Sequence, residues 1–90
     1  MTVKYFGDIR PLVGGLKGEG WSQREPEVGS LLKALGKRHP ALENRLWDGS
    51  QLSSTMIILV NGRSIDFLDG INTRLHPDDL VDVFPVEAGG

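Results

Sequence analysis

Residues 56–62 read MIILVNG, and this stretch decides the fold more than any other part of the chain. Its first five residues form an unbroken apolar run with two isoleucines and one valine, which favours a central strand buried on both faces. Asn61 and Gly62 follow, and this dipeptide is a strong hairpin signal because both central residues of the favoured turn adopt positive φ. The stretch therefore predicts a buried strand at residues 56–60 that turns into a hairpin partner.

Two further strands are expected on the C-terminal side of this turn. A short strand is predicted at residues 64–68, directly after the hairpin. Another is predicted at residues 80–84, after a polar turn at residues 76–79. Pro85 marks its end, because proline has no N–H to donate to a ladder of hydrogen bonds.

The N-terminal part of the chain predicts a looser hairpin. Residues 3–9 read as a strand that Pro11 ends. Residues 14–20 contain four glycines, which is typical of a turn-rich connection. Residues 21–24 are expected to return as a second, antiparallel strand.

One helix is indicated between these two groups of strands. Four apolar residues recur at the spacing of a single helical stripe: Val28, Leu31, Leu32 and Leu35. The helix is expected to begin near Pro26 and to end near His39, because Pro40 pushes the residue before it out of the helical region. Residues 41–54 lack a clear period and are expected to form an irregular, partly helical connection.

Length and charge restrict the classes of function. A chain of 90 residues makes one domain with one modest core, which favours a carrier or binding module over an enzyme with a deep cleft. A net charge of −2 and a pI near 5.6 argue against nucleic-acid binding, which requires a clustered positive field. No apolar stretch approaches the roughly 20 residues that span a bilayer, so no membrane association is expected and a cytoplasmic location is predicted.

The titratable residues do not indicate a side-chain active site. The chain contains no cysteine, which excludes a disulfide framework, a thiolate zinc site, a catalytic thiol and a persulfide held on a side chain. His39 and His76 have no metal-site spacing, so both are expected at the surface and no metal site is predicted. Three acidic residues are expected on a solvated turn and strand face: Asp78, Asp79 and Asp82.

The order strand, strand, helix, strand, strand, strand predicts an α+β domain in which one sheet grips one main helix. This order is the β-grasp, or ubiquitin-like, arrangement, with a mixed sheet of about four to five strands. The domain is expected to span residues 1–85. Residues 86–90 read VEAGG and are expected to form a flexible C-terminal tail, because they are too short and too rich in glycine to pack.

Several short motifs are more specific than the order of the elements. VNG at residues 60–62, FP at residues 84–85 and GG at residues 89–90 occur together. With the helix at residues 28–35 and HPAL at residues 39–42, they resemble the MoaD/ThiS family of sulfur carriers over nearly the whole chain. The chain length and the sizeable segment between the helix and the third strand are most similar to the small subunit of molybdopterin synthase.

The resemblance implies that the C-terminus itself is the functional group. A ubiquitin-activating-type enzyme would adenylate the Gly90 carboxylate with ATP and magnesium, and a persulfide from a sulfurtransferase would convert it to a thiocarboxylate. The large subunit of molybdopterin synthase would then receive the sulfur in molybdopterin biosynthesis. Gly89 and Gly90, preceded by Ala88, suit a narrow channel because glycine has no Cβ. The chain is expected to bind no cofactor and to perform no catalysis alone.

A contact face for these partners is expected around the root of the tail: Phe6, Phe84, Pro85 and Val86. Pro85 has a fixed φ and is expected to project the tail away from the sheet. Core packing is the alternative for the large aromatic residues, because a small domain needs aromatic burial. This alternative applies to Phe6, Trp21, Trp47 and Phe84.

Other functions share parts of this pattern. As a protein modifier, the chain would transfer its activated Gly90 to lysine amines and form isopeptide bonds. As a carrier for thiamine thiazole or another sulfur-transfer pathway, it would keep the thiocarboxylate and change the acceptor. As a non-catalytic interaction domain, it would use only its sheet surface and tolerate the loss of Gly89 and Gly90. One fold serves many functions, so the sequence leaves these alternatives open.

Overall fold

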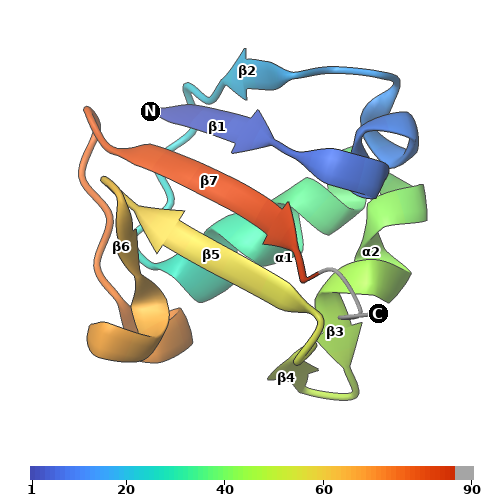
Figure 1. Cartoon of the computed structure of the whole chain (residues 1–90). Helices are drawn as coiled ribbons and strands as arrows, with labels where there is room; N and C mark the ends of the chain where they lie inside the picture. Colours follow the sequence, from blue (N-terminus) through green and yellow to red (C-terminus); the bar gives the residue numbers. More distant parts are fainter. Residues whose placement is uncertain (87–90) are drawn as a thin grey trace.

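A five-stranded mixed sheet grips helix α1 (Val28–Arg38), and the computed structural model describes residues 1–86 (Figure 1). The strands lie in the order β2-β1-β7-β5-β6. Their bounds are β1 (Thr2–Tyr5), β2 (Gly18–Gly20), β5 (Met56–Val60), β6 (Arg63–Ser64) and β7 (Leu80–Pro85). β1 and β7 run parallel, whereas the other neighbours run antiparallel. The predicted α+β, β-grasp fold is confirmed.

Helix α1 covers one face of the sheet, as the spacing of its apolar residues predicts. All four residues of the predicted stripe are completely buried. A capping box between Glu27 and Ser30 fixes the start of the helix by satisfying its free N–H groups. The helix ends at Arg38, and Pro40 begins the next helix at its first position. Both predicted ends of α1 are therefore confirmed.

The position of β5 differs from the prediction. β7 occupies the middle of the sheet, and β5 lies between β7 and β6. β5 is buried on one face only, because Met56 and Ile58 face the core whereas Ile57 is 41% exposed. An unbroken apolar run predicted burial on both faces, but the helices cover only one side of this sheet (Figure 1). Apolar side chains are consequently present on the uncovered side.

The turn at Asn61 and Gly62 is confirmed. The two residues have φ values of 51° and 85°, so both adopt the positive φ that a two-residue hairpin requires. The strands pair Val60 with Arg63 directly across this turn. This local signal therefore fixes the register of β5 against β6.

β6 is shorter than the predicted strand at residues 64–68. The chain leaves the sheet at Ser64, whose hydroxyl accepts a hydrogen bond from the N–H of Asp66 and caps a 3-10 turn. This turn is η2 (Ile65–Phe67), and a second one, η3 (Gly70–Asn72), follows it. Local hydrogen bonding of the serine side chain thus ends the strand early.

β1 ends at Tyr5 instead of residue 9, which corrects the predicted strand. Gly7 has a φ of 67°, a left-handed conformation that ends the strand. The chain then forms the 3-10 segment η1 (Gly7–Val13), which contains Pro11. Ile9 is buried as expected, but it reaches the core from η1.

The second strand also lies elsewhere than predicted. β2 is formed by the glycine-rich segment Gly18–Gly20 and not by residues 21–24. Its antiparallel pairing with β1 is confirmed, but η1 lies in the connection. The backbone of Trp21 still bonds to Met1: its N–H donates to the Met1 carbonyl at 2.8 Å. The side chain of Trp21 enters the core with 3% exposure, and Cζ of Arg38 lies 3.8 Å from its ring centroid. The strand pairing therefore ends at Trp21, where the indole packs into the core.

The connection between α1 and β5 is more regular than expected. It contains α2 (Pro40–Leu46) and a small hairpin of β3 (Trp47–Asp48) and β4 (Gln51–Leu52). α2 packs beside α1 and against η1, and buries Leu42 and Leu46. Two buried leucines four residues apart are sufficient to hold this short helix against its neighbours.

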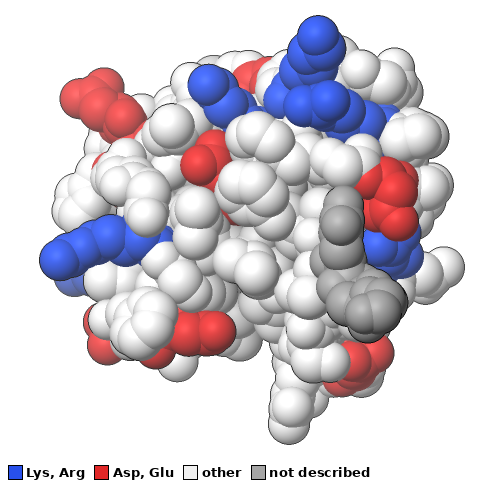
Figure 2. Space-filling model, in the orientation of Figure 1, with Lys and Arg blue, Asp and Glu red and all other residues white. Residues whose placement is uncertain are grey.

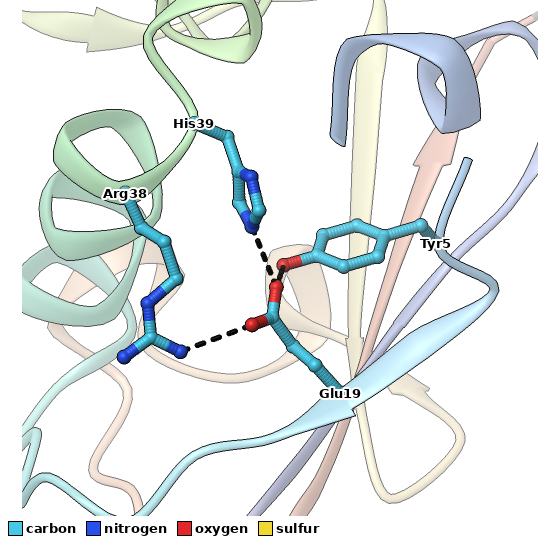
Figure 3. Close-up of polar contacts among 4 residues, drawn as sticks. All are labelled: Tyr5, Glu19, Arg38 and His39. Atoms are coloured by element: carbon cyan, nitrogen blue, oxygen red, sulfur yellow. Dashed lines mark hydrogen bonds and ion pairs between the residues drawn. The ribbon is translucent and has the colours of Figure 1, made fainter. Parts of the chain in front are cut away.

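Glu19 joins β2 to the two helices (Figure 3). Its Oε2 accepts a hydrogen bond from the Tyr5 hydroxyl and lies 2.7 Å from Nε2 of His39, while Nη1 of Arg38 donates to Oε1 at 3.0 Å. Burial alone would raise the pKa of Glu19, but these hydrogen bonds hold the pKa below its usual range. The side chain of His39 is only 14% exposed, so its predicted surface position is wrong.

Asp79 and Asn61 tie the hairpin turn to the start of β7. The Asn61 amide donates to Oδ1 of Asp79 at 2.9 Å, and the N–H of His76 donates to Oδ2 at 2.8 Å. Burial would raise the pKa of Asp79, but these hydrogen bonds hold it below its usual range. Asp79 is 12% exposed, which corrects its predicted solvation; Asp78 is exposed, and His76 is 75% exposed.

Neither a membrane-spanning helix nor a metal-binding cluster is found in residues 1–86. No helix in this range is long and apolar enough to cross a bilayer. Within the same range, no three His, Asp or Glu side chains gather in a way that could hold a metal ion.

Candidate functional site

β7 delivers the C-terminal segment to one end of the sheet (Figure 1). The strand ends at Pro85, and the N–H of Val86 then donates to the carbonyl of Thr55 at 2.6 Å. Since Thr55 directly precedes β5, this bond holds Val86 beside the start of that strand. The side chain of Val86 is 42% exposed. Three predicted tail residues lie outside the described residues: Ala88, Gly89 and Gly90.

Gly7 lies against Pro85 at the point where the chain leaves β7. A Cβ added to Gly7 would come within 2.8 Å of Cγ of Pro85, which is closer than real Cβ contacts allow. The positive φ of Gly7 and this close approach both favour glycine at this position. The path of the chain at Pro85 is therefore bordered by Gly7 on one side and anchored through Thr55 on the other.

Phe6 and Phe84 form a stacked pair next to this exit point. Their ring centroids lie 4.2 Å apart, and their planes differ by 7°. Both residues are half-buried, and neither belongs to the hydrophobic core cluster. Core packing, the alternative for the aromatic residues, holds for Trp21, while Trp47 packs against the core from its edge. The core-packing alternative is wrong for Phe6 and Phe84, because both remain partly accessible outside the core cluster.

A shallow groove surrounds the root of the tail. Its walls come from the junction of β1 and η1, from α2, from the segment before β5 and from the end of β7: Phe6, Gly7, Asp8, Arg45, Thr55, Phe84, Pro85 and Val86. Nη2 of Arg45 lies 3.1 Å from Oδ1 of Asp8, so an ion pair borders the groove. All four residues predicted to form the docking face are brought together here.

The groove shares its stacked aromatic pair with the uncovered face of the sheet, which Figure 2 views directly. Side chains alternate along a strand, so outward-facing residues of β1, β5 and β7 meet on this surface, together with Phe6, which directly follows β1. We name this set the outer face: Lys4, Phe6, Ile57, Leu59, Asp82 and Phe84. In the register of β5 and β7, Ile57 opposes Phe84 and Leu59 opposes Asp82. Apolar side chains thus flank a single carboxylate on these two strands.

Asp82 is less solvated than predicted. The residue is half-buried, and its Oδ1 is buried without a hydrogen-bond partner in the described part of the chain. Burial raises the pKa of Asp82 above its usual range, although the nearby charge of Lys4 acts in the opposite direction. The apolar neighbours on β5 and β7 remove part of the water that a carboxylate on an open strand would retain.

Sequence reasoning missed several residues that complete the groove. Asp8 and Arg45 meet only because α2 packs against η1, and no sequence pattern signals their contact. Thr55 contributes its main-chain carbonyl, which every residue type carries. Gly7 could have been found, because a glycine inside an expected strand often marks a bend or a close backbone approach.

The fold and the position of the exit point define a class of protein. A β-grasp domain whose last strand leads the C-terminal segment past an accessible aromatic pair is a ubiquitin-like protein.

Residues 3–90 match the sequence profile of the ThiS family. The chain is 33% identical over 91 residues to small archaeal modifier protein 3 of Haloferax volcanii, covering 100% of this chain and 98% of that protein. The crystal structure of small archaeal modifier protein 1 from Haloferax volcanii aligns with a TM-score of 0.84 and 27% identity, over 100% of this chain and 98% of the other. A Pyrococcus furiosus protein, provisionally described as subunit 1 of the molybdopterin converting factor, aligns with a TM-score of 0.73 and 29% identity, over 93% of each chain.

The chain therefore belongs to the ThiS family of ubiquitin-like sulfur carriers and modifiers. The resemblance to the MoaD/ThiS family inferred from the VNG, FP and GG motifs is confirmed. The match extends through residue 90, so it includes the tail segment as sequence.

Proposed function

We propose that this protein is a sulfur carrier and that the Gly90 carboxylate is its reacting group. The observation that carries this proposal is the groove at the end of β7, where the stacked pair of Phe6 and Phe84 borders the chain on its way out of the sheet. Accessible apolar surface of this kind marks protein interaction sites. An enzyme that binds the outer face would have the tail within reach of its active site.

Activation of Gly90 follows the chemistry of carboxylates. A carboxylate oxygen attacks the α-phosphorus of ATP, releases pyrophosphate and leaves an acyl-adenylate. A persulfide sulfur, supplied by a sulfurtransferase, then displaces AMP and forms an acyl disulfide. A thiol cleaves the S–S bond, which leaves a thiocarboxylate on Gly90 and a disulfide on the donor. The ubiquitin-activating-type partner supplies the magnesium ion and the groups that stabilise developing charge.

The residues of this chain contribute binding and orientation. Fixing a peptide segment in a partner's active site costs roughly 1–2 kcal/mol of backbone entropy per ordered residue, and contacts with the body of the domain must offset this cost. The hydrogen bond from Val86 to Thr55 and the close contact of Gly7 with Pro85 already fix the chain at Pro85 and Val86, so these two residues add nothing to this cost. Docking through the outer face supplies the compensating contacts.

We propose molybdopterin synthesis as the receiving pathway, with the large subunit of molybdopterin synthase as the acceptor. The similarity to the small-subunit branch in chain length supports this choice. The Pyrococcus furiosus relative, provisionally described as a molybdopterin converting factor subunit, supports it as well. Thiamine thiazole synthesis requires the same carrier chemistry and is the alternative acceptor.

Conjugation to other proteins is the second candidate function. The 33% identity to small archaeal modifier protein 3 of Haloferax volcanii favours it. In this reaction a lysine amine attacks the activated Gly90 carbonyl and forms an isopeptide bond. Both functions begin with adenylation of Gly90, so one protein can serve both.

An intact-mass measurement tests the carrier function. The protein is purified without reducing agents from cells that contain its partners, beside a variant that lacks Gly90. We expect a mass increase equal to the replacement of one oxygen by sulfur in the natural chain and none in the variant. An unmodified mass, together with no acyl-adenylate after addition of the cognate activating enzyme and ATP, would overturn the proposal.

A deletion strain distinguishes the two uses of the activated tail. Accumulation of a molybdopterin precursor after deletion, restored by the natural chain and not by a chain lacking Gly89 and Gly90, supports the carrier. Higher-mass conjugates of a tagged copy that disappear with the same truncation support the modifier. Full function of the truncated chain in both assays would leave an interaction domain in place of either.

A further inference from the structure

One carboxylate lies at the centre of the outer face. Asp82 belongs to β7, the middle strand of the sheet. In the sheet register it pairs with Leu59 of β5 on one side and with Lys4 of β1 on the other. Phe84 follows two residues later on the same face of β7 and opposes Ile57. The carboxylate is therefore bordered mainly by apolar side chains.

The carboxylate of Asp82 lacks some of the hydrogen bonds and ion pairs that would offset its burial within residues 1–86. Its Oδ1 is buried and has no hydrogen-bond partner among residues 1–86. Lys4 is the charged neighbour in the register, but it is exposed and forms no ion pair with Asp82 in that part of the chain. Because Asp82 is half-buried, the accessible part of its side chain is hydrated by solvent at the outer face.

Docking on the outer face would remove this remaining water. Against a purely apolar surface, the carboxylate would become a buried charge without a partner, which strongly opposes binding. Against a surface that carries an arginine or lysine, it would gain a charge-assisted hydrogen bond. The same residue therefore favours one kind of partner and penalises the other.

We propose that Asp82 is a specificity-determining residue, and that the activating enzyme places a cationic side chain against it within an otherwise apolar docking surface. This inference rests on the proposed function and names what the partner must carry. Phe6, Phe84 and Ile57 supply the apolar contact area, and Asp82 supplies the selection against similar apolar surfaces that lack a cation. The tail is then presented only to an enzyme that matches both features.

Steady-state adenylation tests the proposal, with the cognate activating enzyme, ATP and this protein as the varied substrate. Asp82→Asn keeps the shape and removes the charge. Because loss of one member of a buried charge pair weakens binding strongly, we expect it to raise KM about tenfold or more and to leave kcat unchanged. Asp82→Lys should raise KM further. Asp78→Asn removes an exposed carboxylate in the turn before β7 and should behave as the natural chain.

Stability measurements separate docking from folding. Removal of a carboxylate whose burial is uncompensated should leave the urea midpoint unchanged or raise it, so a higher KM of Asp82→Asn cannot come from unfolding. Lys4→Met identifies the source of the cation. If Lys4→Met raises KM as much as Asp82→Asn does, the cation comes from this chain and the proposal is overturned.

The remaining outcomes are also distinct. An unchanged or lower KM for Asp82→Asn would mean that no partner cation meets this carboxylate, and the proposal would fail while the carrier function stands. Absence of adenylation of the natural chain would overturn the carrier function, and the role of Asp82 would fall with it. A KM that rises in the Asp82 variants, but not in Lys4→Met or Asp78→Asn, supports the proposal.

Discussion

Nε2 of His39 lies 2.7 Å from Oε2 of Glu19, and this contact fastens the edge strand β2 to the junction of α1 and α2. Glu19→Gln keeps the shape of the side chain but removes the charge that Tyr5, Arg38 and His39 share. Hydrogen bonds to charged groups contribute about 1.5–3 kcal/mol each, and the remaining amide oxygen keeps part of them. We therefore expect a loss of about 1–3 kcal/mol at neutral pH, measured by urea denaturation.

The same network should make the free energy of unfolding decrease at acidic pH. The folded pKa of Glu19 lies below its ordinary value of 4.5, so its stabilising contribution is present above this pH and is lost as the pH falls through the folded value. The natural chain should therefore lose more stability than Glu19→Gln on acidification. Glu43→Gln, which removes an exposed carboxylate of α2, is the matched control. Parallel stability curves for the natural chain and Glu19→Gln would contradict the role of this network.

Tyr5 should make the fold sensitive to alkaline pH. Burial raises the pKa of its hydroxyl well above the ordinary value of 10.0, and the hydrogen bond to Glu19 adds to this effect. The unfolded chain ionises Tyr5 first, so its contribution is present below pH 10.0 and is lost above it. Tyr5→Phe should lose less stability than the natural chain between neutral and alkaline pH.

Tyrosinate absorbance reports this group alone, because the sequence contains one tyrosine. In the natural chain, ionisation should coincide with unfolding as the pH is raised. Ionisation of Tyr5 in the folded protein near its ordinary pKa would show that the hydroxyl is not held by the buried network.

Substitution of Gly7 should disturb both stability and the exit of the tail. Gly7→Ala forces alanine to adopt a φ of 67°, a left-handed conformation that destabilises an L-residue by about 1–2 kcal/mol. It also places the added Cβ 2.8 Å from Cγ of Pro85. Gly15→Ala is the matched control, because Gly15 has a φ of 80° and no atom near its added Cβ. We expect the Gly7 variant to lose more stability in urea and also to be adenylated less efficiently. Equal losses of stability and equal adenylation would mean that the contact with Pro85 has no consequence.

Phe84 should be needed for docking more than for folding. Phe84→Ala removes one member of the stacked pair on the outer face, and interface aromatic residues often contribute 2 kcal/mol or more to binding. We expect KM for adenylation to rise about tenfold or more. Phe67→Ala, which removes a phenylalanine that is 88% exposed on η2, should leave KM unchanged. A similar effect of both variants would contradict a specific role of the outer face.

The architecture could be predicted because its decisive signals are local. Asn61 and Gly62 specify their turn through their own φ preferences, and the stripe of α1 is specified by spacing within a single helix. The predicted strand at residues 3–9 failed because Gly7 interrupts it with a positive φ that alternating apolar residues do not reveal. The predicted burial of both faces of β5 failed because an apolar side chain such as Ile57 looks the same whether a helix or a partner protein covers it.

The candidate site could be predicted only in part. Phe84 and Pro85 were found because they lie at the end of a predicted strand, and Phe6 because alternation places it on the face of residues 3–9 opposite Val3 and Tyr5. Asp8 and Arg45 could not be found, since only the packing of α2 against η1 brings them together. Residues that meet through tertiary contact carry no mark in a single sequence.

The place of β7 in the sheet has a consequence for how the chain matures. β1 with β2 and β5 with β6 are two separate hairpins until β7 enters between them and joins both. During synthesis these four strands emerge first, and the strand that unites them emerges last, immediately before the tail. Long-range pairing of this kind forms late in folding. The outer face is complete only after β7 has paired with both hairpins. An enzyme that recognises this face therefore binds fully folded molecules and not chains whose sheet is incomplete.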